Sequence, residues 1–307
     1  MFSFLYRRIL TGILVVLLVS SLVFVITRVV ANPELAFLPI DASDAQRASV
    51  RAYLGLDRSL FSQYVTFIGN LIRGDLGESF WQPGKSAMSI VLQRLPLTLA
   101  LDSMAMVIAL TIALPLGIIS ALKPGSWLDR GVVSLSLLGL SAPQFWLGFM
   151  LVMFFGVRLG WLPTSGADQL SSIVLPSLAL ALPTAGKITQ MMRSAMLDEL
   201  ERPYMLAVES KGIGLMDRLL RHSMRNVSVT VLTQSSFEFV RMLAGFTLVV
   251  ESVFAWPGIG RLTVQALEQE DLMLLQAIVV VVATLTVLVN LLTDVLYSVI
   301  DPRIRVS

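Results

Sequence analysis

The chain has 307 residues, of which 55% are hydrophobic and 14% are charged, and its formal net charge is +2. Soluble domains carry roughly 25% charged residues, so this composition excludes an ordinary soluble protein and indicates a membrane protein. The absence of cysteine excludes disulfides and thiolate metal sites, and the single histidine excludes a metal site built from histidines.

Residues 9–27 form the first predicted membrane-spanning helix. They are apolar apart from Ser and Thr, and they number about the 20 residues that a spanning helix needs. A cleaved secretory signal is the alternative, because Val29 and Ala31 fit a small-residue cleavage pattern. The apolar core is longer than the roughly 7–15 residues of a signal peptide. We therefore expect an uncleaved anchor, and we assign residues 1–30 to the N-terminal end and this helix.

Residues 31–94 are polar and form a predicted extramembrane domain. They carry six basic and six acidic side chains, so their charge is balanced. A Gly-Lys-Ser triplet at 84–86 is similar to a phosphate-binding loop, but that motif requires glycine five positions earlier, where this chain has Ser79. The sequence therefore predicts no nucleotide site here.

Five further spanning helices are predicted in residues 95–307, which form the membrane core. The apolar segments are 95–122, 131–155, 171–192, 229–254 and 272–300. The predicted fold is thus an all-α membrane protein with six transmembrane helices and a small extracytoplasmic domain between the first two.

Basic residues are concentrated in the loops on one side of this topology. The short loops on the other side hold only Arg158 and Arg261. Basic loops stay in the cytoplasm, so the distribution predicts that both termini and the loop at 204–226 are cytoplasmic. The basic residues assigned to the cytoplasmic side are Arg7, Arg8, Lys123, Arg130, Arg193, Arg202, Lys211, Arg218, Arg221, Arg225, Arg303 and Arg305.

The stretch 204–233 is the longest polar interruption in the C-terminal half. It predicts a helix, a break at Gly212, where only glycine takes a left-handed conformation cheaply, and a second short helix. The second helix carries an apolar stripe flanked by basic residues, with Leu215, Met216, Leu219 and Leu220 in the stripe and Arg218, Arg221 and Arg225 beside it. Such a hairpin either lies on its own lipid surface or docks in a groove of a soluble partner.

Several motifs resemble the inner-membrane permeases of bacterial ABC importers, in the dipeptide, oligopeptide and nickel group. In the loop, Tyr204, Lys211-Gly212, Arg221-His222 and Arg225-Asn226 resemble the cytoplasmic coupling loop of that family. Residues 54–64, 74–79, 160–166, 251–262 and 301–305 resemble its other characteristic segments. The chain departs from the family where Leu206-Ala207-Val208 replaces Glu-Ala-Ala and Val-Thr at 229–230 replaces Leu-Pro.

The resemblance implies the permease subunit of an ATP-driven, binding-protein-dependent importer of small peptides in the bacterial inner membrane. It implies four kinds of partner: a homologous second permease, two cytoplasmic ATPase subunits, a periplasmic or lipid-anchored solute-binding protein, and membrane lipid. No nucleic acid is expected. The chain would not be an enzyme itself, since ATP and Mg would be bound by the ATPase subunits. The coupling loop, 193–228, would contact an ATPase through Tyr204, Ala207, Lys211, Gly212, Leu215, Arg218, Leu219, Arg221, His222, Arg225 and Asn226.

Two alternatives to peptide import stay open. Permeases for nickel or another metal chelate share these motifs. A secondary transporter driven by an ion gradient would use Glu238, Asp102 or Asp294 as its carrier, although the chain shows no internal repeat and has an extended cytoplasmic hairpin.

Charged residues inside predicted spans are expensive to bury and are therefore functional candidates. Glu238 and Arg241 lie three residues apart on one helix face, close enough to pair. The pair either seals a subunit interface or lines the translocation path. The sequence contains no Ser/His/Asp set or other catalytic constellation.

Overall fold

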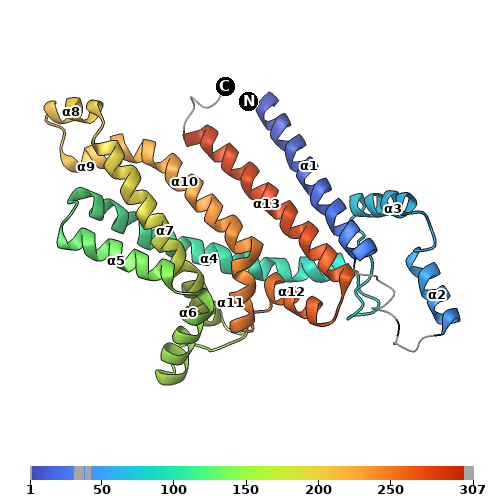
Figure 1. Cartoon of the computed structure of the whole chain (residues 1–307). Coiled ribbons are helices and arrows are strands. Elements are labelled where there is room, and N and C mark those ends of the chain that lie inside the picture. The colour runs from blue at the N-terminus through green and yellow to red at the C-terminus, as the bar shows by residue number, and fades with distance from the viewer. Residues whose placement is uncertain (1, 31–37, 39–42, 301–307) are drawn as a thin grey trace. The chain divides into compact units, whose positions relative to one another are not determined.

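The computed structural model describes residues 2–30, 38 and 43–300 (Figure 1). The terminal motif at 301–305 and the basic residues Arg303 and Arg305 lie outside the described residues, as does most of 31–42. Within the described part the chain is helical, and strand-like pairing is limited to one bridge between Glu78 and Ser86. The helices are α1 (Phe2–Val25), η1 (Ile26–Val30), α2 (Asp44–Leu54), α3 (Leu60–Ile72), α4 (Ala87–Leu122), α5 (Trp127–Ser141), α6 (Gln144–Leu151), η3 (Val152–Arg158), η4 (Leu170–Ile173), α7 (Val174–Leu200), α8 (Pro203–Ser210), α9 (Leu215–Asp217), η5 (Arg218–Ser223), α10 (Met224–Arg241), η6 (Met242–Phe246), α11 (Thr247–Val253), α12 (Ile259–Glu268) and α13 (Leu272–Ile300).

Among the described residues, four helices are long and apolar enough to cross a membrane: Tyr6–Arg28, Ala87–Leu122, Leu170–Leu200 and Leu272–Tyr297. They correspond to the first, second, fourth and sixth predicted spans. The third predicted span is a pair of helices, α5 and α6 with η3, bent by 101° at residues 142–143. Ala142 there is extended because it precedes Pro143. The all-α membrane fold is confirmed.

The predicted count of six spans is not confirmed. The pair α5 and α6 makes a fifth span only if the two are counted together. Residues 229–254, the predicted fifth span, form α10, η6 and α11. That segment includes the charged Glu238 and Arg241, and the backbone at Gly245 leaves helical geometry (φ 179°, ψ −35°).

The chain divides into two compact units. Unit 1 comprises Met1–Leu97 and Pro257–Leu288, and unit 2 comprises Thr98–Trp256 and Val289–Ser307. Unit 1 therefore combines an N-terminal segment that ends at Leu97 with a segment from the C-terminal part of the chain.

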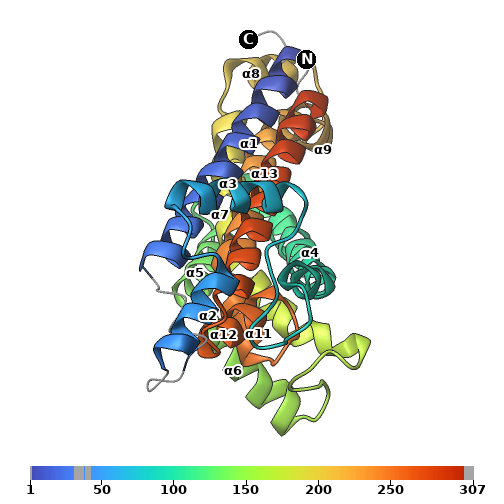
Figure 2. The same ribbon diagram turned by 90° about the vertical axis from the view of Figure 1, so that its right-hand side faces the viewer.

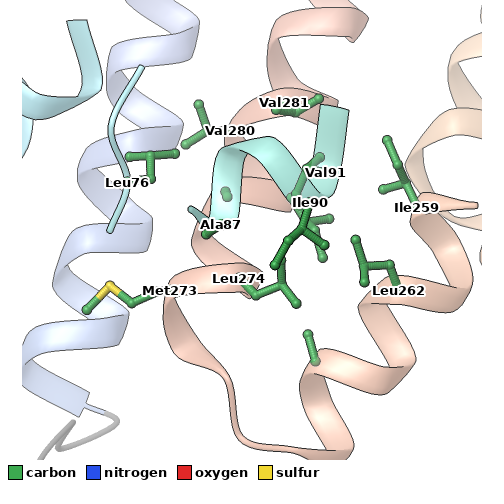
Figure 3. Close-up of a cluster of buried hydrophobic side chains, with 13 residues drawn as sticks. Leu76, Ala87, Ile90, Val91, Ile259, Leu262, Met273, Leu274, Val280 and Val281 are labelled. Atoms are coloured by element: carbon green, nitrogen blue, oxygen red, sulfur yellow. The ribbon is translucent and has the colours of Figure 1, made fainter. Parts of the chain in front are cut away.

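The core of unit 1 is an apolar cluster at the start of α4 and α13, together with one face of α12. Ala87, Ile90 and Val91 of α4 are buried with Leu262 and Leu274 (Figure 3). These positions repeat every three to four residues on their helices, which is the spacing of a buried helical face. Because α12 and α13 lie far along the chain from α4, this core joins the two sequence segments of unit 1.

A buried carboxylate ties the loop before α4 to the start of α13. Asp271 accepts hydrogen bonds from the Ser79 hydroxyl (2.5 Å) and the Trp81 backbone N–H (3.1 Å). Its other oxygen accepts from the Leu274 backbone N–H (3.0 Å), as an N-terminal cap does. The acidic turn at 268–271 therefore positions the loop as well as capping a helix.

Helix α7 is the centre of unit 2. It contacts α5, α6, α10 and α11, and close approach to α5 is possible because Gly186 faces the Ser136 carbonyl oxygen, which a Cβ atom would meet at 2.6 Å. Helices α8 and α9 lie at one end of α7, and α6 lies at the other end (Figures 1 and 2).

Candidate coupling hairpin and buried charges

Residues 203–223 form a hairpin that follows the last turn of α7. Helix α8 begins with Pro203, a residue favoured in the first turn because the N–H it lacks would have no helical partner there. It ends before Gly212, whose φ of +74° is the left-handed conformation that the sequence predicts. The chain then re-enters helix at Leu215 and continues through η5 into α10.

Glu199 holds this hairpin to the end of α7. Its carboxylate is buried (3% exposed) and accepts hydrogen bonds from the Tyr204 hydroxyl and from Nδ2 of Asn226 (2.5 Å). The Arg202 guanidinium forms an ion pair with it (3.1 Å). Three segments, α7, α8 and α10, therefore meet at one carboxylate.

The Tyr204 hydroxyl is set to donate to this carboxylate. Partial burial, together with the hydrogen bond to Glu199, raises the pKa of the Tyr204 phenol above its ordinary value. The phenol therefore keeps its proton throughout the neutral range. The structure thus brings together two predicted site residues, Tyr204 and Asn226, through Glu199, which the sequence-based prediction missed.

The apolar stripe of the second helix is largely exposed. Only Leu219 is buried, at 1% exposure, whereas Leu215, Met216 and Leu220 are between 47% and 66% exposed. Leu206 on α8 is also exposed, at 64%. The hairpin therefore presents apolar side chains that its own unit does not cover.

Charged residues of the hairpin differ in how firmly they are held. Arg218 is mostly buried and pairs with Glu209 of α8 (2.9 Å), which links the two halves of the hairpin. Arg221 pairs with Asp217 (3.4 Å), and both side chains are exposed. Of the other predicted contact residues, His222 is half-buried, and Ala207, Lys211 and Arg225 are exposed.

A second buried carboxylate, Asp129, joins α5 to α7. Its partner on α7 is Arg193, which lies six residues before Glu199. Arg193 donates to both of its oxygens, from Nε (2.6 Å) and from Nη2 (2.8 Å). The Ser120 hydroxyl at the end of α4 (2.5 Å) and the Gly125 backbone N–H (2.7 Å) also donate to it. This bidentate geometry fixes α7 to the first turn of α5.

Glu238 and Arg241 form the ion pair that their spacing predicts. Nη1 of Arg241 lies 3.0 Å from Oε1 of Glu238. The Glu238 side chain is 4% exposed and also accepts from Gln234 (2.9 Å), whereas the Arg241 side chain is 54% exposed. The Arg241 guanidinium lies over the Phe246 ring at 4.7 Å. The Glu238 carboxylate is therefore buried in unit 2, whereas the guanidinium of Arg241 that neutralises it is partly exposed.

Two further carboxylates are buried between α4 and α11 in a reciprocal arrangement. Thr98 of α4 donates to Glu251 of α11 (2.7 Å), and Thr247 of α11 donates to Asp102 of α4 (2.5 Å). On each helix the threonine and the acid are four residues apart, on one face. Both acids are fully buried, so Asp102 lies inside the helix packing rather than at its edge.

Periodicity alone could have identified Glu199. Met192, Met196 and Glu199 follow the spacing i, i+4, i+7, and all three are buried on one face of α7. An acid that continues an apolar stripe is buried, and a buried acid needs donors. For Asp129 the signal is the preceding Ser126, which caps α5 by accepting from the Asp129 N–H and so starts the helix there.

Comparisons with known proteins agree with this architecture. Residues 113–306 match the family model described as binding-protein-dependent transport system inner membrane component. Residues 1–102 match the model for the N-terminal part of such membrane components.

The oligopeptide transport system permease protein AppB of Bacillus subtilis is 34% identical to this chain, covering 99% of the chain and 100% of AppB. The glutathione transport system permease protein GsiC of Escherichia coli K12 is 36% identical, covering 99% of both chains. Among solved structures, a chain of the MetNI methionine ABC transporter in an inward-facing conformation matches with a TM-score of 0.60 and 19% identity. That match covers 70% of this chain and 97% of the MetNI chain, and it shows the fold alone.

Proposed function

The chain belongs to the family of binding-protein-dependent inner-membrane transport components and is a multi-pass permease subunit of an ABC importer, and we propose that it moves small peptides. Full-length similarity to permeases named for oligopeptide and glutathione transport supports the peptide class. A nickel or other metal chelate is the alternative solute, because the sequence motifs of the peptide and nickel permeases are shared.

The hairpin at 203–223 is the element that receives the signal for transport. Its exposed leucines and methionine give it an apolar surface, and an exposed apolar patch rimmed by charged residues is typical of a docking site. The partner is a cytoplasmic ATPase subunit, with ATP and Mg bound there and not in this chain. Glu199 carries the proposal, because it makes the docking surface continuous with α7.

Movement of the hairpin is transmitted through α7. Helix α7 contacts α5, α6, α10 and α11, and the Asp129–Arg193 pair prevents it from sliding independently of α5. ATP-driven closure of two ATPase subunits would displace the hairpin and switch the spans between inward-facing and outward-facing states. Coupling free energies are reciprocal, so a loaded solute-binding protein docked outside favours closure of the ATPase subunits.

The proposed assembly contains two permeases, this chain and a homologue, with two ATPase subunits and one solute-binding protein. Both termini and the hairpin lie in the cytoplasm, and residues 31–94 lie outside. The basic residues of the hairpin and of the loop at 123–130 support this orientation.

The test is the ATPase activity of the complex purified through this chain and reconstituted with its solute-binding protein. We expect stimulation by a panel of dipeptides and oligopeptides. Stimulation only by nickel or zinc chelates would assign the metal branch. Uptake that follows an ion gradient, with no ATP hydrolysis, would contradict the proposal and favour the ion-coupled alternative.

A further inference from the structure

Unit 1 contains a cavity of about 640 Å³ that has no role in the hairpin mechanism. Its walls come from α3, from the loop at 75–83 and from the start of α13. Arg28, at the end of the first spanning helix, also lines it. Sites for small ligands commonly have volumes of about 300–1,000 Å³. The cavity is therefore large enough for a molecule of a few residues.

The walls of the cavity are fixed to the core of unit 1. Leu76 and Met273 line the cavity and also belong to the apolar cluster (Figure 3). Gly77 adopts a left-handed φ of +88°, and a Cβ atom there would lie 3.4 Å from the Met273 sulfur. Because Asp271 also binds this loop, the cavity is preformed.

Gln276 is the side chain that indicates a polar ligand. It lines the cavity and is only 5% exposed, and within the described part of the chain its amide forms no hydrogen bond. The side-chain oxygen of Gln63, a second lining residue, is buried without a partner. A buried amide oxygen without a partner costs roughly 1–3 kcal/mol, so Gln63, together with the amide of Gln276, is suited to a ligand that carries amides of its own.

The charges around the cavity are of both signs. Arg28 and Arg58 supply guanidinium groups, and Asp75 and Glu78 supply carboxylates. A phosphate or other polyanion would be repelled by the acids, and a polycation would be repelled by the arginines. The charges therefore favour a dipolar ligand that carries one group of each sign.

We propose that this cavity binds a short peptide with free amino and carboxyl ends. Arg58 would pair with the carboxylate, Glu78 with the ammonium group, and Gln276 with a peptide amide between them. Phe67 and Phe80 line the same cavity and would contact apolar side chains of the peptide. The proposal rests on the function proposed above, and it adds a solute site in this subunit at the ends of two candidate spanning helices, beside α3 and the loop at 75–83.

Because the chain has no cysteine, a single introduced cysteine can report on the cavity. Thr66 lines the cavity and is exposed, whereas Arg73, at the end of the same helix, is exposed outside it. In the complete complex in lipid nanodiscs without solute-binding protein, we expect saturating Ala-Ala-Ala to slow maleimide labelling of Thr66→Cys about tenfold. Labelling of Arg73→Cys should not change.

The variants test the assigned contacts. Adding Gln276→Leu to Thr66→Cys should abolish the protection, whereas adding Gln269→Leu, an exposed control, should not. Glu78 is exposed, so Glu78→Gln should fold normally. It should weaken protection by Ala-Ala-Ala but not by its N-acetylated form, which has no ammonium group. Equal protection by free, N-acetylated and C-amidated peptides would overturn the charge assignment.

Failure of this inference is distinguishable from failure of the proposed function. If the complex with its solute-binding protein imports Ala-Ala-Ala while Thr66→Cys is never protected, the cavity is not a peptide site and the function stands. If the complex imports only metal chelates, and Thr66→Cys is not protected, both proposals are wrong.

Discussion

Replacing Glu199 by leucine should detach the hairpin from α7 without unfolding the membrane core. The change removes two hydrogen bonds to a charged group, from Tyr204 and Asn226, each contributing about 1.5–3 kcal/mol. Because both donors are partly exposed, the lower end of that range applies, about 3 kcal/mol in total. The Arg202 pair adds at most about 1 kcal/mol, since its side chain is 59% exposed.

A loss of about 3 kcal/mol corresponds to a roughly 100-fold rise in the opening equilibrium of the hairpin. Hydrogen exchange of residues 203–226 in the purified complex measures that opening directly. The number of solute molecules imported for each ATP hydrolysed measures the functional consequence, and we expect it to fall. Glu201→Leu is the matched control, because Glu201 is exposed two residues away. Equal exchange rates and equal coupling in Glu199→Leu and Glu201→Leu would refute the role given to Glu199.

Three further predictions follow from local geometry. Gly212→Ala should lower the coupling of transport to ATP hydrolysis, because a left-handed non-glycine residue costs roughly 1–2 kcal/mol. Gly214→Ala should not lower it, because φ at Gly214 is −61°. The ratio of solute imported to ATP hydrolysed, measured for both variants, tests this. Asp129→Asn should destabilise the protein by about 3 kcal/mol, since it leaves Arg193 without its bidentate partner, and thermal unfolding compared with that of the exposed Asp198→Asn measures the loss. If Glu238 and Arg241 line the path, Glu238→Gln and Arg241→Leu should change the preference between charged and neutral peptides. If each variant takes up charged and neutral peptides as the unmodified protein does, the pair has only a structural role.

The spanning helices with continuous apolar character could be predicted from the sequence. In α1, α4 and α13 length and hydropathy decide the structure, because each contains a continuous apolar helix long enough to cross a membrane. The bend between α5 and α6 is different, because an apolar segment across Pro143 has the composition of one span while its backbone forms two helices. The segment 229–254 also departs from the single predicted span. Its helices are joined through an irregular Gly245 and carry buried polar residues.

The left-handed Gly212 and the Glu238–Arg241 pair were predictable because both depend on spacing along the chain of a few residues. Periodicity on α7 could have predicted that Glu199 is buried, but not which groups it contacts. The contacts of Glu199 and Asp129 depend on donors from other helices, up to 64 residues away for Arg193. The apolar stripe was predicted to face lipid or a partner, but hydropathy did not distinguish Leu219, which is buried, from Leu215, Met216 and Leu220, which are exposed. Tertiary packing of η5 against α7, α8 and α10 decides which of these side chains is covered.

The Asp271 contacts also constrain how the protein is made. Ser79 and Trp81 are hydrogen-bonded to a residue that is about 190 positions later in the chain. At about 5–20 residues per second, a ribosome needs roughly 10–40 s to cover that distance. During this interval the loop before α4 lacks the carboxylate that holds it, and the apolar cluster of unit 1 lacks α12 and α13. The N-terminal part of unit 1 is therefore made early, but its core is completed only when α12 and α13 have been synthesised.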